Sequence, residues 1–163
     1  MKAIVAVDNE WNIGYKNDLL FHIPDDMKFF RKTTLDKVVV MGRKTLESFP
    51  NSKPLKNRIN IVLSRESSKC VEGAKFVSDI EELNEELKKY SSDDIYVIGG
   101  EMIYKLLLPF CDTALVTHVD TVAECADKRF PELSSDEWEL VYQSQNNENN
   151  GLNFKFTEYK RIG

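Results

Sequence analysis

Short apolar runs rich in β-branched residues recur along the chain and predict a series of buried strands. The clearest runs, in chain order, are Ala3–Val7, Val38–Met41, Ile59–Leu63, Ile95–Ile98 and Ala114–Val119. Two further stretches, Trp138–Ser144 and Phe154–Lys160, are predicted as the last strands of the chain. Runs that are apolar at every position are typical of strands in the interior of a sheet.

Helical patterns lie between these strands. The clearest begins at Ser78, where Ser78 and Glu81 have the spacing of a capping box and apolar residues then recur on one helical face. A second helix is predicted after Pro24, and a third between Gly100 and Pro109. Alternation of strands and helices predicts an α/β fold with a mostly parallel sheet. The last two strands have no helix between them, so we expect one antiparallel edge.

Two connecting segments carry further signals. The stretch from Asp8 to Ile23 is about 16 residues long with little regular pattern, and loops of this length are commonly lids or binding loops. It contains Trp11 and Phe21, which make it too aromatic for a plain solvated connection. A surface loop packed on itself is the alternative. The second segment, Asn146–Gly151, lies between two alternating stretches and is predicted as a hairpin connection.

The composition limits the class of protein. With 163 residues, 42% hydrophobic and 30% charged, the chain has the size and balance of one globular domain over 1–163. No stretch approaches the roughly 20 apolar residues of a membrane span, and a net charge of −5 argues against nucleic acid as a partner. Cys70, Cys111 and Cys125 have the odd count and wide spacing of free thiols, which favours a cytoplasmic location. Neither His22 nor His118 has a partner at metal-ligand spacing, so no metal site is expected.

One carboxylate on the helix predicted after Pro24 is a candidate for chemistry. On a helix Asp26 and Phe30 lie one above the other, with Met27 about 100° round, so the carboxylate shares its side with large apolar residues. Stabilisation of the helix dipole is the structural alternative, and Asp25 can supply it from the polar side. A lone carboxylate in apolar surroundings should have a raised pKa and favour a positively charged or proton-donating ligand.

Two strand-to-helix turns indicate an anion site. One is the run Gly42-Arg43-Lys44-Thr45, and the other is Gly99-Gly100. Each turn places backbone N–H groups and a helix N-terminus at the carboxyl end of a strand, where open α/β sheets bind ligands. Ser64-Arg65 offers a third anion contact. Together these turns favour a ligand with several phosphates, such as a dinucleotide, although neither the Rossmann nor the P-loop motif is present.

These features occur in an order that resembles the dihydrofolate reductase family. The matching stretches are Ile4–Asp8, Ile13-Gly14, Ile23–Asp26, Phe29-Phe30, Val38–Ser48, Pro54-Leu55, Arg58–Arg65, Ile95–Gly100, Ile103-Tyr104, Val116–His118, Asp120, Phe130-Pro131 and Trp138. The resemblance implies an eight-stranded, mostly parallel sheet with an antiparallel C-terminal strand, flanked by about four helices. It also implies hydride transfer from NADPH to dihydrofolate, giving tetrahydrofolate for one-carbon metabolism.

The resemblance also assigns the substrate side of the site. Asp26 matches the active-site acid that holds the pterin and favours protonation at its N5, with Thr117 nearby. Arg58 matches the arginine that pairs with the α-carboxylate of the substrate, a role that suits a planar guanidinium. The other expected contacts are the strand positions Ile4, Val5, Ala6 and Ile98 and the apolar walls Met27, Phe30, Phe49 and Leu55. Antifolate inhibitors are expected to bind the same site.

NADPH is assigned by the same resemblance to the glycine turns and their neighbours. Arg43, Ser64 and Arg65 match the group at the 2′-phosphate, which favours NADP over NAD. Ala6 and Ile13 match backbone contacts to the nicotinamide carboxamide, and the loop Asp8–Ile23 matches the mobile lid that closes over the ring. The remaining expected cofactor contacts are Gly14, Leu19, Gly42, Lys44, Thr45, Leu63, Ile98, Gly99, Gly100, Glu101, Met102 and Tyr104. The protein would then act mainly by orienting two rings and excluding water.

Phe21 departs from the family pattern. Many members have Leu-Pro-Trp where this chain has Leu19-Leu20-Phe21. A phenylalanine cannot donate the indole N–H hydrogen bond that would hold a water beside the substrate. We therefore expect Phe21, as part of the catalytic site, to alter antifolate binding and to shift the pH profile.

Two alternatives remain at the level of sequence. A reductase of the same fold acting on another heterocycle, such as the riboflavin-pathway reductase, is countered by the combination of Asp26 and Arg58. A catalytically silent nucleotide-binding module is countered by the retention of the acid, both phosphate turns and Arg58. The residues do not determine the oligomeric state, for which a monomer is the default expectation.

Overall fold

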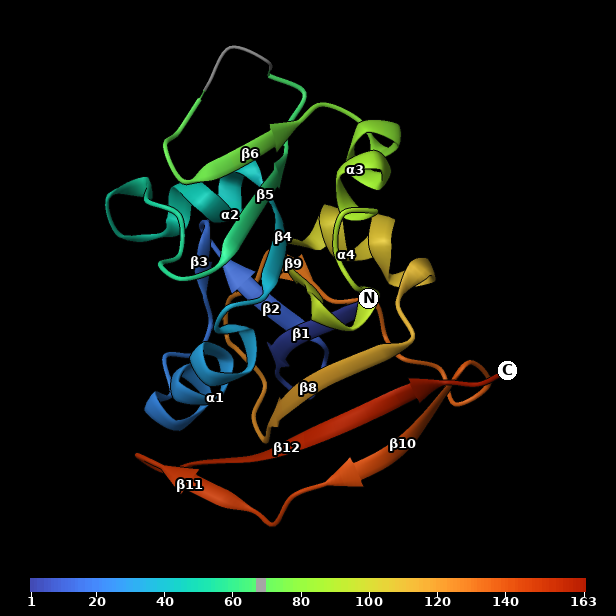
Figure 1. Ribbon diagram of the computed structural model, residues 1–163. Coiled ribbons are helices and arrows are strands. Elements are labelled where there is room, and N and C mark those ends of the chain that lie inside the picture. Colours follow the sequence, from blue (N-terminus) through green and yellow to red (C-terminus); the bar gives the residue numbers. More distant parts are fainter. Residues whose placement is uncertain (67–69) are drawn as a thin grey trace.

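The apolar runs of the sequence form one central mixed β-sheet (Figure 1). The structure is a computed structural model that describes residues 1–66 and 70–163. The strands of the main sheet are β1 (Lys2–Val7), β4 (Val38–Gly42), β5 (Ile59–Leu63), β6 (Ala74–Val77), β7 (Ile95–Gly99), β8 (Thr113–Val119), β10 (Trp138–Gln143) and β12 (Leu152–Arg161). They follow the order β10-β12-β8-β1-β7-β4-β5-β6, and a short strand, β11 (Asn147–Asn149), also pairs with β12.

The strand directions confirm the predicted topology. β1 runs parallel to β7 and β8, and β4 runs parallel to β5 and β7. β12 runs antiparallel to both β8 and β10, so the C-terminal part of the chain forms an antiparallel edge. β1 lies between β8 and β7, which places its carboxyl end beside those of its parallel neighbours.

Four α-helices in the described part of the chain cover the two faces of the sheet. On one side lie α1 (Pro24–Thr34) and α2 (Arg43–Ser48), and on the other α3 (Ile80–Leu87) and α4 (Glu101–Leu107) (Figure 1). The 3-10 helices are η1 (Pro50–Ser52), η2 (Ser92–Asp94) and η3 (Leu108–Phe110). Pro24 opens α1, where its fixed φ and missing N–H suit the first turn. Pro109 lies two residues after the end of α4, within η3, as expected for a residue that ends a helix.

Alternate residues of β4 divide the core into two parts. Val38 and Val40 pack on the side of α3 and α4, in a cluster that includes Leu83. Val39 and Met41 pack on the side of α2. All four β4 side chains are almost completely buried, and full burial of such a side chain contributes about 1.5–3 kcal/mol relative to exposure. Burial on both faces therefore explains why this strand is apolar at every position.

Helix α3 begins one residue later than the sequence predicts. The N-cap is Asp79, whose carboxylate accepts a 2.8 Å hydrogen bond from the backbone N–H of Glu82. Ser78 lies outside the helix and donates its N–H and hydroxyl to Glu82. The capping box predicted from Ser78 and Glu81 is therefore wrong by one position. Asp79 is an equally good N-cap residue, and a helix that starts there lets the Glu82 carboxylate accept both hydrogen bonds from Ser78.

The segment Asp8–Ile23 is more regular than its sequence pattern predicts. β2 (Asn12–Tyr15) and β3 (Asp18–Leu19) form a hairpin, and β9 (Lys128–Arg129) pairs with β2 to complete a small three-stranded sheet. The pattern did not reveal these strands because they are very short and depend on a partner far along the chain. β6, a four-residue strand at the sheet edge, was missed for the same reason.

The predicted hairpin connection Asn146–Gly151 is shorter in the structure than in the prediction. Asn147–Asn149 forms β11, and the tight turn to β12 is made by Asn150 and Gly151 alone. Both turn residues have positive φ, 50° and 82°, as the type I′ turn of a two-residue hairpin requires.

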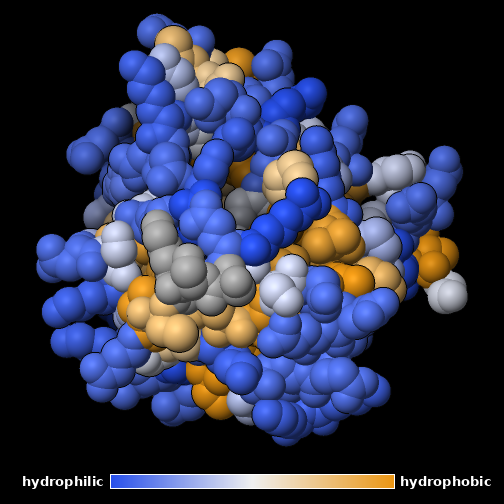
Figure 2. Space-filling view, turned by 90° about the horizontal axis from the view of Figure 1, so that it is seen from above, coloured by the Kyte–Doolittle hydropathy of each residue, from blue (hydrophilic) through white to orange (hydrophobic). Residues whose placement is uncertain are grey.

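The surface is largely hydrophilic on the face shown in Figure 2, where hydrophobic residues gather in a band across the middle. Over the described ranges, no helix combines the length and the apolar character needed to cross a membrane.

Candidate active site

The carboxylate predicted to carry the chemistry lies in the first turn of α1. Asp26 is half-buried, and its Oδ1 accepts a 2.6 Å hydrogen bond from the hydroxyl of Thr117 on β8. Thr117 is itself buried and lies beside Ala6 of β1 in the register of the sheet. Asp25, its neighbour in the sequence, is exposed. The structure therefore separates the two carboxylates: Asp26 faces the sheet and Asp25 faces the solvent.

Burial raises the pKa of Asp26 above its ordinary value, and the hydrogen bond from Thr117 opposes part of that rise. The same carboxylate affects Tyr104 of α4, whose pKa is raised by burial and further raised by the charge of Asp26. The Tyr104 hydroxyl donates a 2.8 Å hydrogen bond to the carbonyl of Ile4. A carboxylate with a raised pKa can hold a proton, or bind a proton-donating ligand, near neutral pH.

The predicted substrate contacts lie on β1, on α1 and on segments that pack against β4. Ile4, Val5 and Ala6 are consecutive on β1, which pairs with the Thr117 strand. On α1, Met27 is 51% exposed and Phe30 is half-buried, so both leave apolar surface open to a ligand. The other predicted contacts are the wall residues Phe49 and Leu55 and the strand position Ile98. All three are partly buried and pack against the core cluster of Val39 and Met41.

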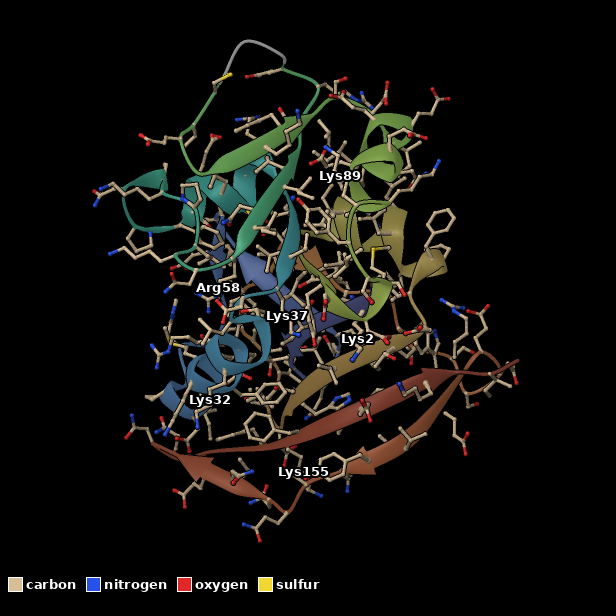
Figure 3. All side chains as sticks on the ribbon, viewed as in Figure 1. Lys2, Lys32, Lys37, Arg58, Lys89 and Lys155 are labelled. Atoms are coloured by element: carbon tan, nitrogen blue, oxygen red, sulfur yellow. The ribbon has the colours of Figure 1, made fainter. Side chains whose placement is uncertain are left out.

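Arg58 lies directly before β5 and beside α1 (Figure 3). Its Nε donates to the hydroxyl of Thr34 at 3.2 Å, Nη1 donates to the carbonyl of Lys56 at 2.8 Å, and Nη2 donates to the carbonyl of Arg31 at 3.0 Å. A guanidinium has five N–H donors, so one N–H on each terminal nitrogen is left after these contacts. Such a pair of donors is suited to a carboxylate.

The two glycine turns lie next to each other at the carboxyl ends of β4 and β7. In the register of β4 and β7, Met41 lies beside Gly99, so the turns that follow these strands are neighbours. Gly99 has a φ of 123°, and a Cβ there would lie 3.4 Å from the Tyr104 ring. A Cβ on Gly100 would lie 3.6 Å from the hydroxyl oxygen of Thr45. Glycine is therefore required at Gly99 by conformation, and the turns expose backbone N–H groups at the starts of α2 and α4.

The basic residues predicted at the cofactor site follow the ends of β4 and β5. Gly42 and Leu63 lie opposite each other in the register of β4 and β5. Arg43 and Ser64 are the next residues of the two strands, so they leave the sheet at the same level. Arg43 is half-buried and pairs with Glu47, one turn later on α2. Ser64 is buried, whereas Lys44 and Arg65 are exposed. Strand ends, cationic groups and a hydroxyl together form a surface that suits a phosphate.

Two residues of α4, Glu101 and Met102, differ in their contacts near the glycine turns. Glu101 accepts a 3.1 Å hydrogen bond from the backbone N–H of Arg129, which joins the second glycine turn to β9. Met102, in contrast, is 74% exposed. Its place in the cofactor site therefore has less structural support than that of Tyr104.

The predicted lid is anchored by two carboxylates that the sequence patterns did not identify. Asp8 is 1% exposed and accepts hydrogen bonds from the backbone N–H groups of Glu10, Asn12 and Ala123 and from the side chain of Asn12, each at 2.9 Å. Burial by itself would raise the pKa of Asp8, but these bonds together lower it. The second is Asp127, which contacts the hairpin.

Asp127 holds the β2–β3 hairpin at its turn. Its N–H donates to the carbonyl of Gly14 at 2.9 Å, and its carboxylate accepts from the N–H of Lys16 at 3.1 Å. Ile13 and Gly14 are buried, and Leu19 pairs with Gly14 but is 64% exposed. The loop thus has a fixed base at Asp8 and exposed apolar surface near its end.

Phe21, the departure from the family pattern, is partly buried. It packs against a small cluster formed by Ile23, Val119 and Phe154. This cluster joins the end of the loop to β8 and β12, so the aromatic ring lies where the loop enters α1.

Glu47, Asp8 and Asp127 are the site residues that sequence reasoning missed. A signal existed for Glu47, because Arg43 and Glu47 have the i, i+4 spacing of a helical ion pair. No local pattern could identify Asp127, since its partner Lys16 lies 111 residues away. Asp8 bonds to Glu10 and Asn12 nearby, but its bond to Ala123 joins residues 115 positions apart.

The chain is similar in sequence and in fold to known proteins. Residues 1–161 match a family model described as dihydrofolate reductase. Among curated proteins, the dihydrofolate reductase of Bacillus subtilis is 33% identical over 160 residues, covering 97% of this chain and 92% of that protein. The dihydrofolate reductase of Neisseria gonorrhoeae is 35% identical over 157 residues, covering 96% and 94%. A solved structure of dihydrofolate reductase from Enterococcus faecalis, complexed with NADP(H) and RAB-propyl, superposes with a TM-score of 0.88 at 32% identity, covering 99% of this chain and 96% of that one.

Proposed function

The chain belongs to the dihydrofolate reductase family, and we propose that its NADPH-dependent reduction of dihydrofolate takes place beside Asp26. The enzyme transfers hydride from NADPH to dihydrofolate and forms tetrahydrofolate. The observation that carries the proposed site is the half-buried Asp26, bonded to Thr117 at 2.6 Å beside the middle of the sheet.

Asp26 binds the pterin ring of the substrate. A pterin presents an amino group and a ring N–H side by side, and a carboxylate accepts hydrogen bonds from both. The negative charge of Asp26, in half-buried surroundings, makes protonation of the ring at N5 more favourable. Thr117 fixes the orientation of the carboxylate through Oδ1.

Arg58 and the apolar walls bind the remainder of the substrate. The two N–H groups left on Arg58 bind the α-carboxylate of the glutamate portion. Met27, Phe30, Phe49 and Leu55 supply apolar contacts for the p-aminobenzoyl ring between the two charged ends. These contacts set the position of the pterin relative to Asp26.

The cofactor residues present fit NADPH. The glycine turns expose backbone N–H groups and leave no Cβ at Gly100 beside Thr45, which permits the close approach of phosphates. Arg43, Ser64 and Arg65 follow adjacent strands and would hold the 2′-phosphate. When bound, NADPH supplies the hydride, and the protein supplies position and electrostatics.

The loop that contains β2 and β3 excludes water from the two rings. Asp8 anchors its first residues, and Asp127 anchors its hairpin. Water exclusion strengthens the interaction between Asp26 and the pterin, because the local dielectric falls.

We also propose that this single domain works as a monomer in the cytoplasm. Cys70, Cys111 and Cys125 are free thiols, which is typical of a reducing compartment.

The loss of absorbance at 340 nm with NADPH and dihydrofolate tests the proposed site. Asp26→Asn should reduce kcat/KM by roughly 100-fold or more at neutral pH. Asp25→Asn removes a neighbouring carboxylate on the same helix turn and should leave activity unchanged, since Asp25 is exposed. Full activity of Asp26→Asn would contradict the proposed role.

A further inference from the structure

The ion pair between Arg43 and Glu47 lies on the first turns of α2, next to the proposed 2′-phosphate subsite. Arg43 follows Gly42, and Gly42 is the register partner of Leu63, which precedes Ser64 and Arg65. Glu47 lies one helical turn beyond Arg43 and faces the same side of α2. One carboxylate is thus placed within the group of residues that would bind an anion.

The contact between the two side chains is specific. Nη1 of Arg43 donates to both carboxylate oxygens of Glu47, with Oε2 at 3.0 Å. The two side chains are 29% and 34% exposed, so solvent screens their charges only in part. Nε and Nη2 of Arg43 make no hydrogen bond to any residue that the structure describes. Arg43 can therefore bind an anion through these atoms while Glu47 keeps hold of Nη1.

The positive charge of Arg43 and the negative charge of Glu47 have opposite effects on the binding of a 2′-phosphate. NADPH and NADH differ only at the ribose 2′ position, where NADPH has a phosphate and NADH a hydroxyl. An arginine there stabilises the phosphate, whereas an acidic side chain repels it and is the group that binds the free hydroxyl in many dinucleotide-binding proteins. This chain has both kinds of group one turn apart on α2.

We propose that Glu47 is a specificity-determining residue that weakens the preference of the enzyme for NADPH over NADH. Its carboxylate neutralises part of the Arg43 charge and repels the 2′-phosphate, while it places no penalty on a 2′-hydroxyl. This role depends on the proposed function, because it requires the 2′-phosphate to lie beside Arg43.

Steady-state kinetics of Glu47→Gln with each cofactor test the role. Glutamine keeps the shape of the side chain and removes its charge. We expect the KM for NADPH to fall roughly 3- to 10-fold, with the KM for NADH within about twofold of its original value and kcat unchanged. The gain should diminish at high ionic strength, since screening weakens interactions between partly exposed charges.

Glu85→Gln is the matched control. Glu85 pairs with Lys88 on α3, at 2.7 Å, and both side chains are exposed. This variant makes the same change in net charge away from the cofactor turns. It should leave the ratio of kcat/KM for NADPH to that for NADH unchanged, so a similar gain in this control would overturn the proposal.

Two further results would also overturn the role of Glu47. A higher KM for NADPH in Glu47→Gln would mean that Glu47 orders Arg43 for the phosphate, and an equal change with both cofactors would mean a merely structural role. Arg43→Gln separates this failure from a failure of the proposed function. If Arg43→Gln lowers the NADPH preference but Glu47→Gln does not raise it, only the role of Glu47 is wrong. If Arg43→Gln leaves the preference unchanged, the proposed place of the 2′-phosphate is wrong as well.

Discussion

The hydroxyl of Thr117 donates a 2.6 Å hydrogen bond to Oδ1 of Asp26, a residue 91 positions away in the chain. This contact joins α1 to β8 and fixes one oxygen of the carboxylate. Oδ2 and the second lone pair of Oδ1 are left for the two donors of the pterin in the proposed function. The bond also acts on the proton affinity of the group, because burial raises the pKa of Asp26 and Thr117 opposes that rise.

Thr117→Val should move the pH profile of hydride transfer to higher pH. The variant removes the bond that opposes the rise, so the pKa of Asp26 goes further up and the carboxyl keeps its proton to higher pH. The proposed function uses the charged form of Asp26, so the rising limb of the rate against pH, along which that form appears, then shifts upward, as single-turnover kinetics would measure. Thr157→Val is the control, because the Thr157 hydroxyl is also buried but donates to the carbonyl of Val116. An unshifted limb in Thr117→Val would contradict the electrostatic role of the bond.

Asp26→Asn should be more stable than the unchanged chain at neutral pH, although it loses activity. The folded state raises the pKa of Asp26, so the favourable contribution of the protonated acid is present at low pH and is lost as pH rises through the folded pKa. Asparagine does not ionise, so the variant avoids this loss. Urea unfolding near pH 7 should show a higher midpoint for the variant, and the advantage should vanish near pH 4, below which Asp is protonated in both states. Asp25→Asn should show no such gain, and a lower midpoint for Asp26→Asn at neutral pH would argue against a cost of burying the charge.

Arg58→Lys should weaken the binding of dihydrofolate and leave NADPH binding unchanged. A lysine cannot hold Thr34, Lys56 and Arg31 and still present two parallel donors to a carboxylate. We expect the KM for dihydrofolate to rise roughly 10- to 100-fold. Arg31→Lys changes an exposed arginine on α1, the helix whose Arg31 carbonyl Arg58 contacts, and should alter neither KM. Equal effects of both variants would exclude a specific role for Arg58.

Asp8→Asn should destabilise the fold, by about 2–3 kcal/mol. The amide nitrogen of asparagine would meet the N–H of Ala123 or the side-chain amide of Asn12, where the carboxylate now accepts hydrogen bonds. Chemical denaturation would measure the loss. Asp120→Asn is the control, because Asp120 is exposed and, among the residues that the structure describes, its carboxylate accepts only from Asn9.

The carboxylate of Asp8 should also contribute to the pH dependence of the free energy of unfolding of the unchanged chain. The folded state lowers the pKa of Asp8, so its contribution is present above the unfolded pKa and is lost as pH falls through the folded pKa. The free energy of unfolding should therefore fall in acid, below about pH 4. Asp8→Asn should show a flatter dependence over this range, and an identical slope would contradict the assignment.

Phe21→Trp should change the affinity for an antifolate inhibitor and shift the pH profile of the reaction. Tryptophan adds an indole N–H that can hold a water beside the substrate, and one such hydrogen bond corresponds to a change of roughly fivefold in affinity. Inhibition constants and kcat/KM against pH would measure the effect. Phe110→Trp makes the same substitution at a residue that is 65% exposed on η3 and should change neither quantity. Unchanged inhibition and kinetics in Phe21→Trp would exclude this role for Phe21.

The sequence by itself determined the main strands, the helices and the nature of the ligands. Runs such as Val38–Met41 are apolar at every position and rich in β-branched residues, so they predicted buried strands, and the glycine turns after them indicated phosphates. Asp26 was identified because a carboxylate among apolar residues on a helix is unusual. The order of these stretches then indicated the family that the comparisons show.

Only the tertiary structure decided how these residues act on one another. The Thr117 bond to Asp26, the Tyr104 bond to Ile4 and the Asp8 anchor to Ala123 each join residues about a hundred positions apart. Strand register decides which of these residues come into contact. Register depends on how distant segments pack together rather than on local preference. The short strands β2, β6 and β9 were missed for the same physical reason, because each is stabilised by its partner strand and too little by its own sequence.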